Sequence, residues 1–171
     1  MATIEADHFR HVLGHLPTGV TVVTAHGPEG PAGITANSVT SVSLDPPLIL
    51  MCVARQSRTG QTIMEAGRFC INVIGADDVE TPTRFATRRP DRFDEVPWHD
   101  RPGGPGLDAA VAWIECDIRD RHGAGDHTII VAEVTAIDAA DAATPLVFFR
   151  GAYGTFGAIN RSRTPDLASR R

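Results

Sequence analysis

The sequence predicts a mainly β domain, an antiparallel barrel with a few peripheral helices. Segments typical of strands outnumber segments typical of helices, and the strand-like segments mostly follow one another. The regular alternation of strand and helix that builds a doubly wound parallel sheet is missing. The chain also lacks a GxGxxG turn, so a nicotinamide nucleotide, if used, is not held by a Rossmann fold.

The first element is a short helix. Phe9, Val12, Leu13 and Leu16 recur at helical spacing, which predicts a helix over residues 7–16. The strands that follow are apolar or β-branched runs bounded by turn residues. We expect them at 20–25, 34–44, 48–54, 68–74, 109–121, 127–137 and 145–156.

Shorter segments connect these strands. Residues 59–66, closed by Gly67, and residues 77–87 read as short helices. Residues 87–106 form a long polar connection with four prolines, and connections of this length are often functional or mobile. We expect one domain over residues 1–156 and a polar tail over 157–171.

Composition restricts the function classes. A net charge of −5 gives no basic footprint for nucleic acid and no attraction to anionic membranes. No apolar run is long enough for a spanning helix, and the N-terminus lacks the features of a signal peptide. Cys52, Cys70 and Cys116 have no spacing typical of a metal site, so we expect reduced thiols, no metal and a cytoplasmic protein. All sixteen basic residues are arginine, which excludes lysine-based covalent or phosphate chemistry.

Small hydrogen-bonding side chains are concentrated in residues 34–44. Alternate residues of a strand share a face, and here both faces are polar enough to bind an uncharged polar ligand. One face would present Thr35, Asn37, Val39, Ser41 and Ser43, and the other Ile34, Ala36, Ser38, Thr40, Val42 and Leu44.

The stretch "RQSRT" follows the next strand. Arg55 and Arg58 supply planar donors, Ser57 and Thr59 supply hydroxyls, and a helix beginning there would add backbone N–H groups. These groups could bind a phosphate. The alternative is a surface turn with a capping hydroxyl and two solvated arginines.

The order of several motifs is more specific than any one of them. "PTGVTVVTA", "GITANSVTSVSLDPPLILMCVARQSRT", "GRFCINV", "RFA", "DRF", "GDHTIIVAEV" and "PLVFFRGAYGTF" resemble the short-chain flavin reductase family over roughly residues 7–156. These proteins are FMN-binding split barrels that serve as reductase components of two-component flavin-dependent monooxygenases.

The resemblance implies a six-stranded Greek-key split barrel that forms a homodimer, with flavin near the dimer interface. It implies reduction of FMN or FAD by NADH or NADPH and delivery of the reduced flavin to a separate monooxygenase. By resemblance the flavin would contact Thr35, Ala36, Asn37, Ser38, Ser41, Val42, Ser43, Cys52, Ala54, Arg55, Ser57, Arg58 and Thr59.

Four further residues are assigned by the same resemblance. His127 of "GDHT" would lie near the nicotinamide as a positioning or proton-relay residue, unless it only satisfies the end of a hairpin. Phe85 and Arg92 would border the nicotinamide pocket, and Tyr153 would cap the site. Hydride transfer needs alignment of two rings more than it needs a protein acid or base.

Two other functions remain open from the sequence. One is a flavin carrier or sensor that binds flavin without turnover. The other is a split-barrel reductase that keeps its flavin tightly bound and reduces another acceptor. The choices between FMN and FAD and between NADH and NADPH also remain open.

Overall fold

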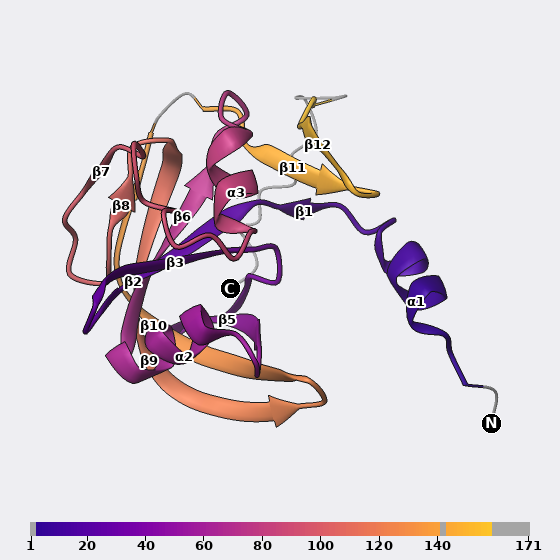
Figure 1. Ribbon diagram of the computed structural model, residues 1–171, viewed down its shortest axis with the longest axis horizontal. Coiled ribbons are helices and arrows are strands. Elements are labelled where there is room, and N and C mark those ends of the chain that lie inside the picture. Colours follow the sequence, from indigo (N-terminus) through magenta and orange to yellow (C-terminus); the bar gives the residue numbers. More distant parts are fainter. Residues whose placement is uncertain (1–2, 141–142, 159–171) are drawn as a thin grey trace.

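The computed structural model describes residues 3–140 and 143–158 (Figure 1). Within them the chain forms three helices and twelve strands. The helices are α1 (Ala6–Leu13), α2 (Arg58–Ala66) and α3 (Glu80–Phe85). The strands are β1 (Thr18–Gly19), β2 (Thr21–Gly27), β3 (Gly30–Ala36), β4 (Thr40–Leu44), β5 (Pro47–Ala54), β6 (Arg68–Ile74), β7 (Trp98–His99), β8 (Gly106–Leu107), β9 (Ala110–Ala124), β10 (His127–Ala139), β11 (Leu146–Phe149) and β12 (Ala152–Thr155).

An antiparallel sheet of seven strands, in the order β3-β2-β6-β9-β10-β5-β4, forms the body of the protein. Six of them are long, and the shorter β4 extends the sheet beyond β5. The sheet curls around its own apolar face but β3 and β4 remain separate edges, as in a split barrel (Figure 1). This confirms the predicted mainly β class and barrel. A second sheet, β1-β11-β12, lies beside the barrel.

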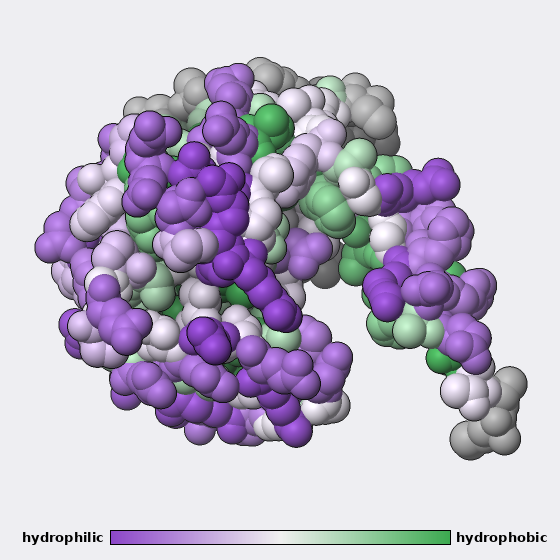
Figure 2. Space-filling model, in the orientation of Figure 1, coloured by the Kyte–Doolittle hydropathy of each residue, from purple (hydrophilic) through white to green (hydrophobic). Residues whose placement is uncertain are grey.

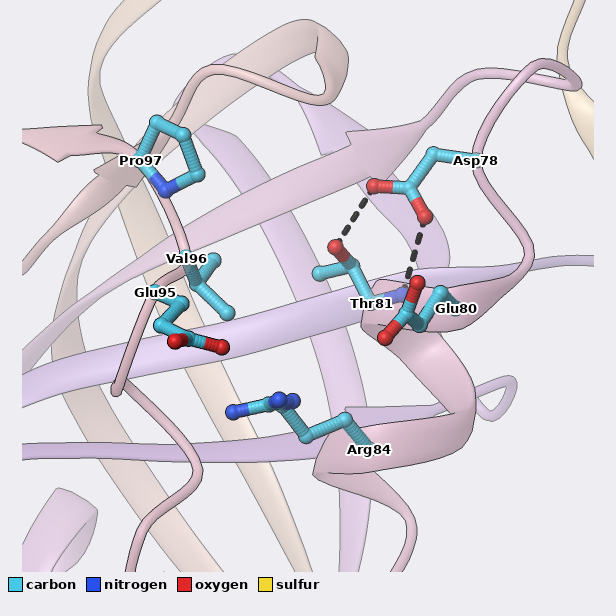
Figure 3. Close-up of a pocket in the computed structure, with 7 residues that line it drawn as sticks. All are labelled: Asp78, Glu80, Thr81, Arg84, Glu95, Val96 and Pro97. Carbon is cyan, nitrogen blue, oxygen red and sulfur yellow. Dashed lines mark hydrogen bonds between the residues drawn. The ribbon is translucent and has the colours of Figure 1, made fainter.

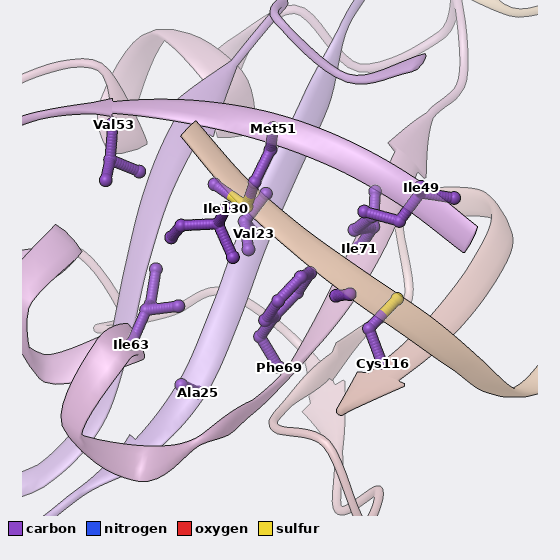
Figure 4. Close-up of a cluster of buried hydrophobic side chains, with 11 residues drawn as sticks. Val23, Ala25, Ile49, Met51, Val53, Ile63, Phe69, Ile71, Cys116 and Ile130 are labelled. Atoms are coloured by element: carbon purple, nitrogen blue, oxygen red, sulfur yellow. The ribbon is translucent and has the colours of Figure 1, made fainter. Parts of the chain in front are cut away.

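The barrel interior follows the period of two expected of strands. Ile49, Met51 and Val53 of β5 all point inward and are buried. They meet buried residues of β2, β6, β9 and β10, as Figure 4 shows. Ile63 of α2 is fully buried in the same cluster, so this helix covers one end of the barrel.

Helix α2 has the ends that the sequence predicts. Ser57 is its N-cap, and its Oγ accepts a hydrogen bond from the Gly60 N–H at 3.0 Å. Gly67 ends it in the left-handed conformation, with φ of 72°. Strand β5 and α2 are therefore joined by a tight, fixed connection.

The long connection after α3 is not a uniform loop. Its second half, residues 98–108, lies as a strap across the outer face of β2, β6 and β9 and contains the small β7–β8 pair. The fully buried Asn72 holds it: its Nδ2 donates to the Pro105 carbonyl at 3.3 Å, and its Oδ1 accepts from the Leu107 N–H at 2.7 Å.

Two further contacts attach the strap to the sheet. Arg101 of the strap forms an ion pair with Glu115 of β9 at 3.1 Å. Gly104 has φ of 153°, and a Cβ there would lie 2.5 Å from the carbonyl oxygen of Thr24.

Three predicted elements are wrong in detail. Residues 34–44 form two strands, because the chain leaves β2 after Ala36 and joins β5 from Thr40. Residues 145–156 form a hairpin instead of one strand, with its turn at Arg150 and Gly151, where φ is positive. The first helix ends at Leu13, short of the predicted 16. The predicted tail lies, from residue 159 on, outside the described residues, and the division at residue 156 stays a prediction.

Helix α1 stands apart from the barrel (Figure 1), and a wide hollow separates it from the body of the protein in Figure 2. None of its residues is buried. No helix among the described residues has both the length and the apolar character needed to cross a membrane.

Candidate functional site

The start of α2 gathers cationic and hydroxyl groups. Ser57 and Thr59 lie in its first turn, directly after β5. The backbone N–H groups of Arg58 and Thr59 belong to this first turn and have no acceptor among residues 3–140 and 143–158. A helix end of this kind attracts anions, because its N–H groups and dipole present positive charge.

Arg92 joins this cluster from the connection after α3. Its guanidinium donates to the Gly33 carbonyl at 2.9 Å and to Thr59 Oγ1 at 3.0 Å. The Nε of Arg92 is buried and has no hydrogen-bond partner among the described residues. Partial burial lowers the pKa of this guanidinium. Arg92 therefore links β3 to the start of α2 and brings a partly desolvated cation to it.

His127 lies at the first position of β10, opposite Ala54 of β5. Its Nδ1 is 2.8 Å from Asp126 Oδ1, so Nδ1 donates its proton to this carboxylate, and in the neutral ring Nε2 is left to accept. The hydrogen bond from His127 and its charge lower the pKa of the Asp126 carboxyl. About half of the His127 side chain is exposed, at 45%.

Arg55 connects His127 to the α2 cluster. Its backbone N–H donates to the Asp126 carbonyl at 3.0 Å, and its Nε donates to the His127 carbonyl at 3.3 Å. These two bonds tie the β9–β10 hairpin to the connection between β5 and α2. An imidazole and a cationic helix start are thus held together by one backbone hydrogen bond and by one bond from the Arg55 guanidinium to a backbone carbonyl.

The segment between β3 and β4 is fixed by a hydroxyl. Ser38 Oγ donates to the Cys52 carbonyl at 3.0 Å and accepts from the Cys52 N–H at 3.2 Å. Thr35 Oγ1 donates to the Pro82 carbonyl at 2.5 Å. The hydroxyl protons of Thr35 and Ser38 are therefore both donated to backbone carbonyls of the protein. Asn37 and Ser41 are exposed and remain available to a ligand.

The comparisons with known proteins agree on one family. The family described as "Flavin reductase like domain" matches residues 13–157. The chain belongs to this family. It is 46% identical to the FMN reductase (NADH) SmoA of Agrobacterium fabrum over 149 residues, which are 86% of this chain and 84% of that protein. It is 36% identical to the flavin-dependent monooxygenase reductase subunit HsaB of Mycobacterium tuberculosis over 157 residues, 89% of this chain and 83% of that protein.

Solved structures place the fold in the same family. The NADH:FAD oxidoreductase of Streptomyces globisporus, in complex with NAD and FAD fragments, superposes with a TM-score of 0.85. The two chains are 35% identical, and the alignment covers 98% of this chain and 99% of that one. The predicted resemblance to the flavin reductases is confirmed.

Six of the predicted site residues lie together in this flavin reductase. Arg55, Ser57 and Thr59 surround the start of α2 with Arg92, and His127 lies beside Ala54. Their roles toward flavin and nicotinamide stay predictions. Asp126 was missed by the sequence analysis, although its position next to His127 in "GDHT" is the signal that could have identified it.

Two predicted aromatic residues pack against other aromatic side chains. Phe85 has no exposed surface and packs edge to face against Phe93, so it belongs to the core beneath the surface and cannot itself line an open pocket. Tyr153 packs against Phe148 on the second sheet, and none of its described contacts is with the α2 cluster. An aromatic residue in a motif can serve either packing or a ligand, and the sequence does not separate the two.

A cavity of about 410 Å³ lies beside α3 and contains none of the predicted residues (Figure 3). Asp78 caps α3 through the Thr81 N–H and hydroxyl, and Arg84 donates to the carbonyls of Asp91 and Asp94. Asp78 and Arg84 of this cavity therefore serve local structure.

Proposed function

We propose that this flavin reductase uses NADH or NADPH to reduce FMN or FAD and passes the reduced flavin to a separate flavin-dependent monooxygenase. The observation that supports this most is the cationic start of α2 held beside His127. The names of two relatives, an FMN reductase (NADH) and a monooxygenase reductase subunit, support the same reaction and the same partner.

The residues present fit the phosphate end of a flavin nucleotide. The N–H groups of Arg58 and Thr59 and the Thr59 hydroxyl lie at the start of α2, where the Arg92 guanidinium bonds to Thr59, and Arg58 follows the Ser57 cap. Charged hydrogen bonds to phosphate are among the strongest that proteins make. The exposed polar residues between β3 and β5 would then contact the remainder of the flavin.

When bound, the flavin supplies the acceptor for a hydride from the nicotinamide. The chain itself needs to hold the two rings in contact and to exclude other acceptors. His127 would hold a nicotinamide group or move a proton at Nε2, while Asp126 keeps its Nδ1 proton in place. Arg55 fixes the backbone of His127 relative to the α2 cluster.

The proposal also covers the oligomeric state of the protein and its location in the cell. We infer a homodimer, which would add a second surface to an otherwise open site. We also infer a cytoplasmic location, supported by three cysteines that are free in the structure.

Oxidation of NADH by the purified protein, measured with and without added FMN or FAD, tests the proposal. We expect oxidation that depends on the added flavin and saturates with it. A purified protein that binds flavin without oxidising NADH or NADPH would contradict the reductase and favour a flavin carrier. Oxidation that needs no added flavin would favour the reductase of another acceptor.

A further inference from the structure

Arg92 and Phe93 are the two central residues of a tight turn in the connection after α3. The Asp94 N–H donates to the Asp91 carbonyl at 3.2 Å, which closes the turn. The two central side chains make different contacts. Phe93 packs against a buried apolar cluster, whereas Arg92 reaches the start of α2. The geometry of this turn therefore decides where the Arg92 guanidinium lies.

Arg84 of α3 holds both ends of the turn. Its Nη1 donates to the Asp91 carbonyl at 3.1 Å and to the Asp94 carbonyl at 2.6 Å. These carbonyls stand on either side of Arg92 and Phe93, so one cationic nitrogen bridges the first and last residues of the turn. Hydrogen bonds from a charged donor are about twice as strong as neutral ones. Figure 3 shows the Arg84 side chain extending from α3 toward this connection.

Phe93 provides a second anchor for the turn. Its ring packs edge to face against the fully buried Phe85, with centroids 4.8 Å apart, and against Trp98 at 6.3 Å. Gly33 of β3 makes room for this packing, because a Cβ there would lie 2.5 Å from Phe85 and 3.2 Å from Phe93. The carbonyl of Gly33 also accepts the bond from Arg92 at 2.9 Å. The aromatic rings therefore seat the turn against β3 at the residue that Arg92 contacts.

Arg92 keeps donors for a ligand in this position. Both of its described bonds, to the Gly33 carbonyl and to Thr59 Oγ1, come from Nη1. Within residues 3–140 and 143–158 its Nη2 makes no hydrogen bond. Thr59 belongs to the first turn of α2, so a phosphate bound there would lie beside this guanidinium. A planar guanidinium is well suited to phosphate.

We propose that Arg84 is a positioning residue for the flavin phosphate: it does not touch the flavin and acts by holding the turn that carries Arg92. This inference rests on the flavin site proposed above and adds to it a residue that lies outside it. Arg84 fixes the turn through two backbone carbonyls, and Phe93 fixes it through aromatic packing. If either anchor is lost, Arg92 has to be ordered when the flavin binds, and that cost weakens the binding.

The binding of two flavins to matched variants tests this role. FMN carries a phosphate and riboflavin does not, so the ratio of their dissociation constants measures the phosphate contact. Arg84→Met removes both bonds and keeps an unbranched apolar stem. We expect it to weaken FMN binding at least about threefold, the cost of ordering one side chain, and to leave riboflavin binding within about twofold. Quenching of flavin fluorescence gives both constants without any nicotinamide nucleotide.

Two other substitutions of arginine serve as controls. In Arg84→Lys a single nitrogen still carries three donors, and both bonds of Arg84 come from a single nitrogen, so this variant should bind FMN more tightly than Arg84→Met. Arg88→Met removes the same charge from an exposed position that makes no hydrogen bond among the described residues. It should change neither constant by more than about twofold. A loss of FMN affinity in Arg88→Met as large as in Arg84→Met would assign the effect to charge alone and overturn the positioning role.

A double-mutant cycle with Arg92 separates positioning from a direct effect. If Arg84 acts through Arg92, Arg84→Met should weaken FMN binding in the otherwise unchanged protein and add almost nothing to Arg92→Met. An equal loss on both backgrounds would show that Arg84 acts independently, and would overturn the proposal.

The remaining outcomes distinguish this inference from the proposed function. Arg92→Met with an unchanged ratio of FMN to riboflavin affinity would overturn the inference, while NADH oxidation that depends on flavin would still support the reductase. Equal weakening of both flavins by Arg84→Met would indicate general loosening and also overturn it. A protein that binds neither flavin would contradict both. Circular dichroism checks folding, and Phe93→Leu, which weakens the other anchor, should give the same selective loss of FMN if Arg84→Met does not fold.

Discussion

Replacing Asn72 with Ala should destabilise the protein by loosening the strap over the outer face of the sheet. The Asn72 side chain is fully buried and makes four hydrogen bonds, three through Nδ2 and one through Oδ1. The Pro105 carbonyl keeps its bond from Thr24 Oγ1 at 2.6 Å, but the Leu107 N–H, which lies in a buried segment, loses its only described side-chain partner. An unsatisfied buried donor costs about 1–3 kcal/mol, and the lost amide contacts add to this.

We therefore expect the free energy of unfolding to fall by about 3 kcal/mol, a large part of the ordinary stability of a domain. Urea unfolding followed by tryptophan fluorescence measures it, because Trp113 donates to the Leu107 carbonyl at 3.1 Å and so reports on the strap. Asn37→Ala is the matched control: Asn37 is exposed, and the change should stay within about 0.5 kcal/mol. A loss below about 1 kcal/mol for Asn72→Ala would refute the role of this side chain in holding the strap.

Three other changes test the site and the thiols. Arg58→Ala should weaken flavin binding more than about tenfold, as expected for the loss of a charged hydrogen bond, and an unchanged dissociation constant in a fluorescence titration would remove Arg58 from the site. His127→Ala should lower the rate of flavin reduction more than flavin affinity, whereas equal losses would indicate a structural role. Burial raises the pKa of the Cys70 and Cys116 thiols to about 12 each, so a thiol reagent at neutral pH should label Cys52 alone in the folded protein; rapid labelling of all three would contradict that burial.

The order of the strands was predictable because each one is a short apolar or β-branched run between turn residues. The start of α2 was equally predictable, since Ser57 and Gly67 are the residues that a helix uses at its two ends. The position of the cationic residues at the end of β5 was also predictable, because Arg55 and Arg58 follow this apolar strand directly in the sequence.

Other features depend on contacts distant in the sequence, which local patterns do not contain. The segment between β3 and β4 is held by the bonds of Ser38 to the backbone of Cys52, fourteen residues away. The strap depends on Asn72, which reads in the sequence as one polar residue within an apolar strand. Phe85 was assigned to a pocket because its motif is similar to that of the family, but the neighbouring Phe93 covers it.

Anaerobic stopped-flow mixing tests the central claim most directly. The purified protein is mixed with FMN or FAD and then with NADH or NADPH, and the absorbance of oxidised flavin is followed. We predict rapid loss of this absorbance with at least one pairing, faster than in a control without protein, and the fastest pairing identifies both substrates. Flavin that binds but keeps its absorbance with every donor would contradict the proposed reductase.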